Sequence, residues 1–142
     1  MTDPERTAID DGVRETLLDR VNSQSATVGA SVPDEIEIRG ETVDLSAFIV
    51  ETRKVDTIPP ALDRRVSAAR ESLRAERERR VERLESDALD RETAESLAEE
   101  AIGIDRALNA LAGIRRPGFA DEHHADTVES HERWLAFVDQ VR

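Results

Sequence analysis

The chain has 142 residues, a length that suits one domain built around one hydrophobic core. It contains no cysteine, which excludes disulfides, thiolate zinc sites and cysteine nucleophiles. Residues 1–11 lack the apolar run of a signal peptide, and no segment approaches the roughly 18 consecutive apolar residues of a membrane span. We therefore expect a cytosolic protein with no membrane contact.

The charge of the chain is strongly acidic and has an unusual make-up. There are 32 Asp and Glu residues against 20 basic ones, a formal net charge of −12. Of the basic residues, 19 are Arg and only Lys54 is Lys. Mutual repulsion of carboxylates opposes compaction unless salt screens it. We interpret the composition as an adaptation to molar salt, as in proteins of halophilic archaea.

Apolar side chains recur with helical spacing in several segments. A recurrence every three or four residues marks one face of a helix. In the predicted helix over residues 91–112 the apolar spacing is unbroken from Ala94 to Leu111. In the predicted helix over residues 61–85 the spacing fails between Leu73 and Val81. We therefore expect the far end of the 61–85 helix to be solvated or to meet a partner. The predicted helices span residues 5–22, 47–54, 61–85, 91–112 and 125–141, with residues 1–5 frayed.

Residues 35–45 are predicted to form a β-hairpin, because apolar and polar side chains alternate strictly on both sides of a glycine. The expected tight turn is Gly40-Glu41, since glycine adopts positive φ at low cost. An isolated hairpin is marginal in water, so its apolar face must rest on helices. Ser46 and Asp90 are the expected N-caps of the short helix and of the helix that begins at Arg91.

Together these elements predict an α+β domain, mainly α, over residues 1–142. The short link between residues 85 and 91 makes the two long helices antiparallel neighbours. The expected frame is a long antiparallel helical hairpin, with a small β-hairpin and flanking N- and C-terminal helices.

The predicted long helix is an electrostatic exception in this chain. Residues 60–87 contain eight Arg and seven acidic residues, so they are close to neutral while the remainder carries −13. A row of arginines could contact phosphates or another partner. Glutamates interleave with the arginines at spacings of three and four, however, which favours a solvated helix. The candidate interaction residues are Arg70, Arg74, Arg77, Arg79, Arg80 and Arg83.

Three histidines, at positions 123, 124 and 131, cluster among acidic residues. His131 begins a segment that resembles the zinc-protease pattern His-Glu-x-x-His, but Leu135 stands where the second ligand belongs. We interpret the histidines as structural or adventitious. The alternative is a metal site with His124 and His131 as ligands. No catalytic or cofactor-binding residues are predicted.

Polar side chains also interrupt the most regular apolar helix, at Asp105, Arg106 and Asn109. Asp105 flanks the apolar seam, where it could meet an arginine of the long helix. Such a partly buried pair more often fixes register than performs catalysis. We predict a structural role for these three residues.

Four segments together resemble a family of short, uncharacterised haloarchaeal proteins, a domain of unknown function. They are Ala26–Pro33, the hairpin as far as Phe48, Pro59-Pro60 and Gly103–Leu111. The resemblance covers the chain from about residue 13 and implies a haloarchaeal cytosolic origin. It implies no catalytic residues.

Two functions from different classes fit these observations. The first is a non-enzymatic interaction or adaptor protein that contacts another protein, or itself, through its helices. The alternative is a nucleic-acid-associated or regulatory protein that uses the arginines of the long helix. Interleaved glutamates and the lack of aromatic stacking platforms favour the first.

The acidic composition predicts that folding depends on salt. Because screening shortens the reach of carboxylate repulsion, the thermal midpoint is expected to rise steeply between about 0.1 M and 3 M KCl. Thermal melts followed by circular dichroism measure it. Equal midpoints at the two salt concentrations would contradict the interpretation.

Overall fold

A computed structural model describes residues 8–23, 33–114 and 132–142 of the chain. The described part is mainly helical, with one small antiparallel sheet, as the sequence predicted. None of its helices combines the length and apolarity that crossing a membrane requires. In chain order the elements are α2 (Asp11–Asn22), β1 (Glu35–Ile38), β2 (Glu41–Asp44), α3 (Leu45–Arg53), the 3-10 helix η1 (Pro60–Leu62), α4 (Asp63–Ser86), α5 (Arg91–Ala112) and α6 (Glu132–Val141).

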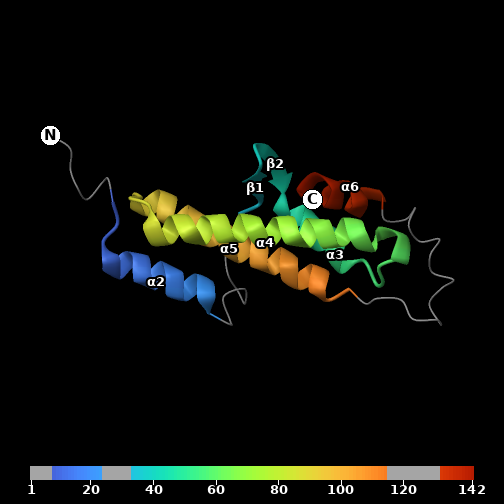
Figure 1. Cartoon of the computed structure of the whole chain (residues 1–142), viewed down its shortest axis with the longest axis horizontal. Coiled ribbons are helices and arrows are strands. Elements are labelled where there is room, and N and C mark those ends of the chain that lie inside the picture. Colours follow the sequence, from blue (N-terminus) through green and yellow to red (C-terminus); the bar gives the residue numbers. More distant parts are fainter. Residues whose placement is uncertain (1–7, 24–32, 115–131) are drawn as a thin grey trace.

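The long helices α4 and α5 form the frame of the molecule (Figure 1). They run antiparallel, because Arg77 of α4 pairs with Asp105 of α5 while Arg80, further along α4, pairs with the earlier residue Glu100. The Asp90 side chain caps α5, accepting from Thr93 N at 2.7 Å, as predicted. The expected helical hairpin is therefore present.

Two hydrophobic clusters lie along this frame. The first joins α3, η1, the β-hairpin and α6 to the N-terminal half of α4 and the C-terminal half of α5. The second joins α2 to the other halves of α4 and α5, through Leu17 and Val21 against Val81 and Leu84. From the break in the apolar spacing of α4 we expected its far end to be solvated or to meet a partner. Helix α2 of the same chain covers that end instead.

The hairpin stands out from α4 and α5, with α6 on the β2 side of it (Figure 1). Its turn is Arg39-Gly40, with φ of 52° and 82°, and Glu41 already pairs with Ile38. The predicted Gly40-Glu41 turn is wrong by one residue. A two-residue turn of this hand needs positive φ at both positions, and Gly40 supplies the second rather than the first.

Two predicted helix starts also need correction. The Asp44 side chain caps α3 by accepting from Ala47 N at 3.0 Å, whereas Ser46 donates to Asp34 Oδ1, so the helix begins at Leu45. The first helix begins at Asp11 with Asp10 as its cap, and the described residues before it are not helical. In the predicted C-terminal helix, residues 125–131 lie outside the described residues.

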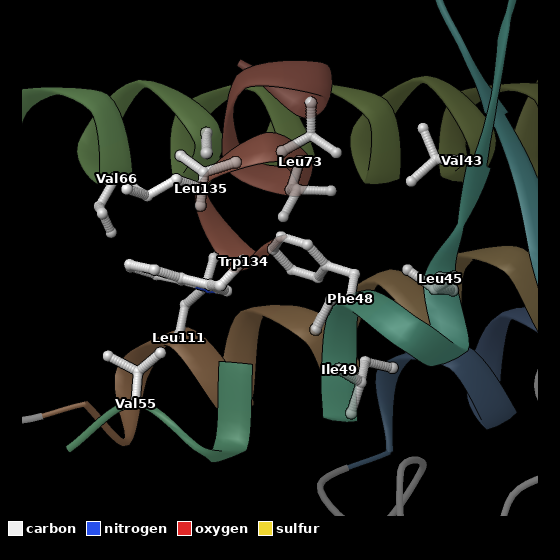
Figure 2. Close-up of a cluster of buried hydrophobic side chains, with 14 of the residues drawn as sticks. Val43, Leu45, Phe48, Ile49, Val55, Val66, Leu73, Leu111, Trp134 and Leu135 are labelled. Carbon is white, nitrogen blue, oxygen red and sulfur yellow. The ribbon is translucent and has the colours of Figure 1, made fainter. Parts of the chain in front are cut away.

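The first cluster is built around buried aromatic side chains. Figure 2 shows Trp134 and Phe48 between the long helices, close to Leu73 and Leu111. Phe48 meets Phe137 edge to face, with ring centroids 6.2 Å apart. Trp134 Nε1 donates to Thr52 Oγ1 at 3.0 Å, and Thr52 Oγ1 donates to the Phe48 carbonyl at 2.6 Å. This chain of hydrogen bonds ties α6 to α3.

Trp134→Phe is expected to destabilise the protein by about 2 kcal/mol, because it removes the indole donor and leaves a void. Urea unfolding in high salt, followed by circular dichroism, measures the change. Thr52→Ser, which keeps the acceptor, is the matched control and should cost less than about 1 kcal/mol. Wild-type stability of Trp134→Phe would show that the indole hydrogen bond does not hold α6 in place.

Candidate functional site

Charged side chains fill the interval between Leu73 and Val81 on α4. We call Glu76, Arg77 and Arg80 of α4, with Glu100 and Asp105 of α5, the polar layer. It lies where the two hydrophobic clusters meet, since Leu73 belongs to the first and Val81 to the second. The break in the apolar spacing is therefore an internal boundary of the fold.

Arg80 is the centre of the polar layer. Its side chain is 9% exposed, yet every nitrogen of the guanidinium has an acceptor. Nε donates to Glu100 Oε1 at 2.8 Å, and Nη1 donates to the Glu76 carboxylate at 2.9 Å and to the Glu76 carbonyl at 3.0 Å. Nη2 donates to the Glu37 carbonyl on β1 at 2.7 Å. One side chain thus joins α4, α5 and the hairpin.

Glu76 is the buried anion of this network, with a side chain 7% exposed. Burial raises the pKa of this carboxyl, but hydrogen bonds and attraction from Arg79 and Arg80 outweigh burial and bring the pKa below its usual range. Both carboxylate oxygens accept from arginines, Oε1 from Arg79 and Oε2 from Arg80. Glu76 therefore stays ionised and serves as a structural anion.

Asp105 meets an arginine of the long helix, as its position on α5 suggested. Arg77 Nε lies 2.7 Å from Asp105 Oδ1, and Arg77 Nη2 also donates to Asn22 Oδ1 of α2 at 3.4 Å. Here burial dominates and raises the pKa of Asp105 above its ordinary value, despite the attraction of Arg77. Burial thus raises the pKa of both carboxyls, but arginine contacts outweigh it at Glu76 and do not outweigh it at Asp105.

A groove of about 550 Å³ opens between the hairpin and the surface of α4 and α5. We call it the hairpin groove. Arg79 and Arg83 lie on its α4 side and are about half exposed, while Glu35, Glu37 and Glu100 bring negative charge to it. It is lined by Glu35, Ile36, Glu37, Gly40, Thr42, Glu76, Arg79, Arg80, Arg83, Thr93, Ser96, Leu97 and Glu100.

The six candidate interaction arginines do not form one open surface. Arg80 is buried and Arg77 is held against Asp105, so neither is available to an external phosphate. The structure brings Arg79, Arg80 and Arg83 together at the groove, and it leaves Arg74 on the exposed surface beside Glu71. Arg70 is half-buried, and its Nε has no hydrogen-bond partner among the described residues.

The remaining candidates lie elsewhere. His124 and His131 fall outside the described residues, and the described part of the chain contains no group of three metal-binding side chains. Arg106 is half-buried, and Asn109 is exposed on α5 at a hollow beside Thr52 and Val55. Of the three predicted structural polar residues, only Asp105 belongs to the polar layer.

A comparison with protein families decides where this chain belongs. The profile described as "Family of unknown function (DUF5788)" matches residues 9–139, nearly the whole chain. The chain belongs to the DUF5788 family. No curated protein and no solved structure matches it.

The network around Arg80 was not predicted from the sequence of this DUF5788 chain. A signal was present, because helical spacing from Leu73 would place further core-facing positions near Glu76 and Arg80. Charged residues at such positions indicate buried pairing. Their acceptor on the hairpin, a backbone carbonyl, leaves no trace in the sequence.

Two charge-removing substitutions in the polar layer are predicted to differ. Glu76→Gln leaves buried Arg80 short of a counter-ion and should cost about 2 kcal/mol at neutral pH. Asp105→Asn removes a charge that burial already disfavours, and it should change stability by less than about 1 kcal/mol. Urea unfolding at fixed salt measures both.

The pH dependence of the stability of the same variants tests the directions of the two pKa shifts. The stabilisation from ionised Glu76 is present above an ordinary Glu pKa of about 4.3 and is lost as pH falls through its lower folded value. Asp105, whose folded pKa is raised, gains stability as pH falls. Glu76→Gln should therefore flatten the loss of stability in acid and Asp105→Asn should steepen it. The reverse order would refute the assignment.

Proposed function

We propose that this chain is a non-enzymatic adaptor that binds a segment of a partner protein in the hairpin groove. The observation that carries the proposal is the mixed charge of the groove. Arginines stand on its α4 side, whereas Glu35, Glu37 and Glu100 approach from the hairpin and α5. A polypeptide carries both signs of charge and can match such a surface, whereas a polyanion matches only half of it.

The arrangement of the arginines supports a protein partner over nucleic acid. Phosphate binding needs several cations free to face one backbone. Arg74, Arg79 and Arg83 each pair with a carboxylate of α4 or its C-cap, at three or four residues' distance. These pairs lower the positive charge that the helix presents to a phosphate backbone, which weakens the support for the alternative function, a nucleic-acid-associated protein.

The chemistry of the groove supports a binding role. Its most buried carboxylate, Glu76, has a lowered pKa, which opposes a role as a proton donor near neutral pH. Arg80 is similarly committed, with acceptors on three structural elements. These groups hold the shape of the groove, and the exposed charges at its margin are left to select a partner.

We further propose that the protein works in the cytoplasm of a halophilic archaeon. Its support is the net charge of −12 together with the scarcity of Lys, one residue against 19 Arg. In molar salt, exposed ion pairs are strongly screened. Recognition in such a solvent favours contacts that combine charge with backbone hydrogen bonds and shape, which a groove offers.

A photo-crosslinking side chain at Ser96, an exposed residue that lines the groove, is predicted to capture a protein partner in a high-salt lysate. The same side chain at exposed Glu82, outside the groove, is the control. Purified partner should bind Arg83→Gln about fivefold more weakly, because a charge at the groove margin is lost. Arg74→Gln, which removes an equally exposed arginine outside the groove, should bind normally.

Adducts formed equally from both positions, or equal effects of the two arginine substitutions, would contradict a groove site. Single-stranded and duplex oligonucleotides are titrated in the same buffer. Binding to them that depends on Arg79 and Arg83 would favour the nucleic-acid alternative instead.

A further inference from the structure

At each position of the hairpin, the backbone N–H and carbonyl groups point either toward the other strand or outward from the sheet. Leu45 N donates to Asp34 O at 2.8 Å, so residues 34 and 45 form a hydrogen-bonded pair. Hydrogen-bonded and open pairs alternate in an antiparallel ladder. Given the pairing of Glu35 with Asp44 and of Glu37 with Thr42, the backbone groups of these four residues point outward from the hairpin.

Two helix side chains confirm that direction. Arg80 Nη2 donates to the Glu37 carbonyl from the β1 side, and Gln140 Nε2 donates to the Thr42 carbonyl at 2.9 Å from the β2 side. The outer edge of β2 is also packed against α6. The two edges of the sheet are therefore not equivalent.

The outer edge of β1 opens on the hairpin groove, which Glu35, Ile36 and Glu37 line. Arg80 occupies the Glu37 carbonyl. For the other outward groups, the Glu35 N–H, the Glu35 carbonyl and the Glu37 N–H, no hydrogen-bond partner exists among the described residues. Natural sheets usually cover or block such an edge.

Building on the proposed function, we propose that the groove receives an extended segment of the partner as a third strand along β1. The outward groups of Glu35 and Glu37 would supply the main-chain hydrogen bonds of strand addition. Side chains opposite Glu35 and Glu37 would lie on the same face of the sheet, where basic residues are favoured. The alternate side chains point to the helix side and suit acidic or polar residues near Arg79 and Arg83.

An extended partner fits the groove better than a helical one. A helix in a groove is held by apolar anchors at spacings of three and four. The bulky apolar residues that line this groove are Ile36 and Leu97, and both side chains are already buried in the two clusters. Main-chain bonding and charge are what the groove offers.

A second copy of this chain is a poor occupant. Pairing β1 with β1 would set Glu35 and Glu37 of one copy against the same glutamates of the other. Like charges directly opposite each other on neighbouring strands are destabilising. The partner strand therefore belongs to another protein and carries basic side chains at alternate positions.

The test begins with a display library of random 12-residue peptides, selected on the whole protein in high salt. Selected peptides are then measured on Glu35→Pro and Glu35→Gln by calorimetry. Proline removes the outward N–H, which β2 does not use, and it is tolerated on an edge strand. Glutamine removes only the charge, and thermal melts check that both variants fold.

Strand addition predicts that Glu35→Pro weakens binding by about tenfold or more and Glu35→Gln by only a few-fold. It also predicts a period of two when single peptide residues are N-methylated, because alternate N–H groups face β1. Basic residues should be enriched at every second position of the selected peptides.

The outcomes separate the two proposals. Binding that is weakened by Arg83→Gln, but survives Glu35→Pro and shows no period of two, would overturn strand addition and leave the groove as a protein site. A selection that yields no peptide sensitive to Arg83→Gln or Glu35→Pro would overturn both.

Discussion

The described fold depends on one buried cation, Arg80. Its guanidinium donates to a carboxylate and a carbonyl of α4, to a carboxylate of α5 and to a carbonyl of β1. A buried ion pair is a weak source of net stability, but removing one of the two carboxylates leaves the buried guanidinium short of a counter-ion. The network therefore specifies one arrangement: α4 and α5 in a single register, with β1 above them. The hairpin groove follows from that arrangement, since Arg80 lies at its base.

Arginine also ties other elements together through backbone oxygens. Arg14 of α2 donates to carbonyls of Leu84 and Asp87 at the C-terminus of α4, and Arg39 in the hairpin turn donates to those of Val141 and Arg142 at the end of α6. Cations are favoured at helix C-termini. The planar guanidinium reaches two acceptors at once, which the lysine ammonium does less well. A lysine at position 14 or 39 would therefore replace these contacts only in part.

The sequence predicted what periodicity controls and missed what single contacts control. The apolar spacing of α5 fixed its face and placed Asp105 beside an arginine of α4, and alternation placed Ile36 and Ile38 in the core. The hairpin turn was misplaced because a glycine satisfies positive φ at either central position. The cap of α3 was misassigned because Asp44 and Ser46 are both good caps. The groove could not be predicted because its shape depends on the contact of Arg80 with a main-chain carbonyl of β1. Any residue could supply such a carbonyl, so the sequence carries no sign of it.

Arg80 also limits how a strand could lie along β1. It holds the Glu37 carbonyl, so an added strand has the two polar groups of Glu35 and the N–H of Glu37 to bond. Pairing is then confined to the half of β1 away from the turn, and the rest of the guest must run over α4 and α5, toward Arg83 and Ser96. Such a guest would contact the hairpin, which belongs to the first hydrophobic cluster, and also the surface of α4 and α5 beside the second cluster. Because the polar layer lies at that boundary, an occupied groove would hold the two halves of the fold in one relative position.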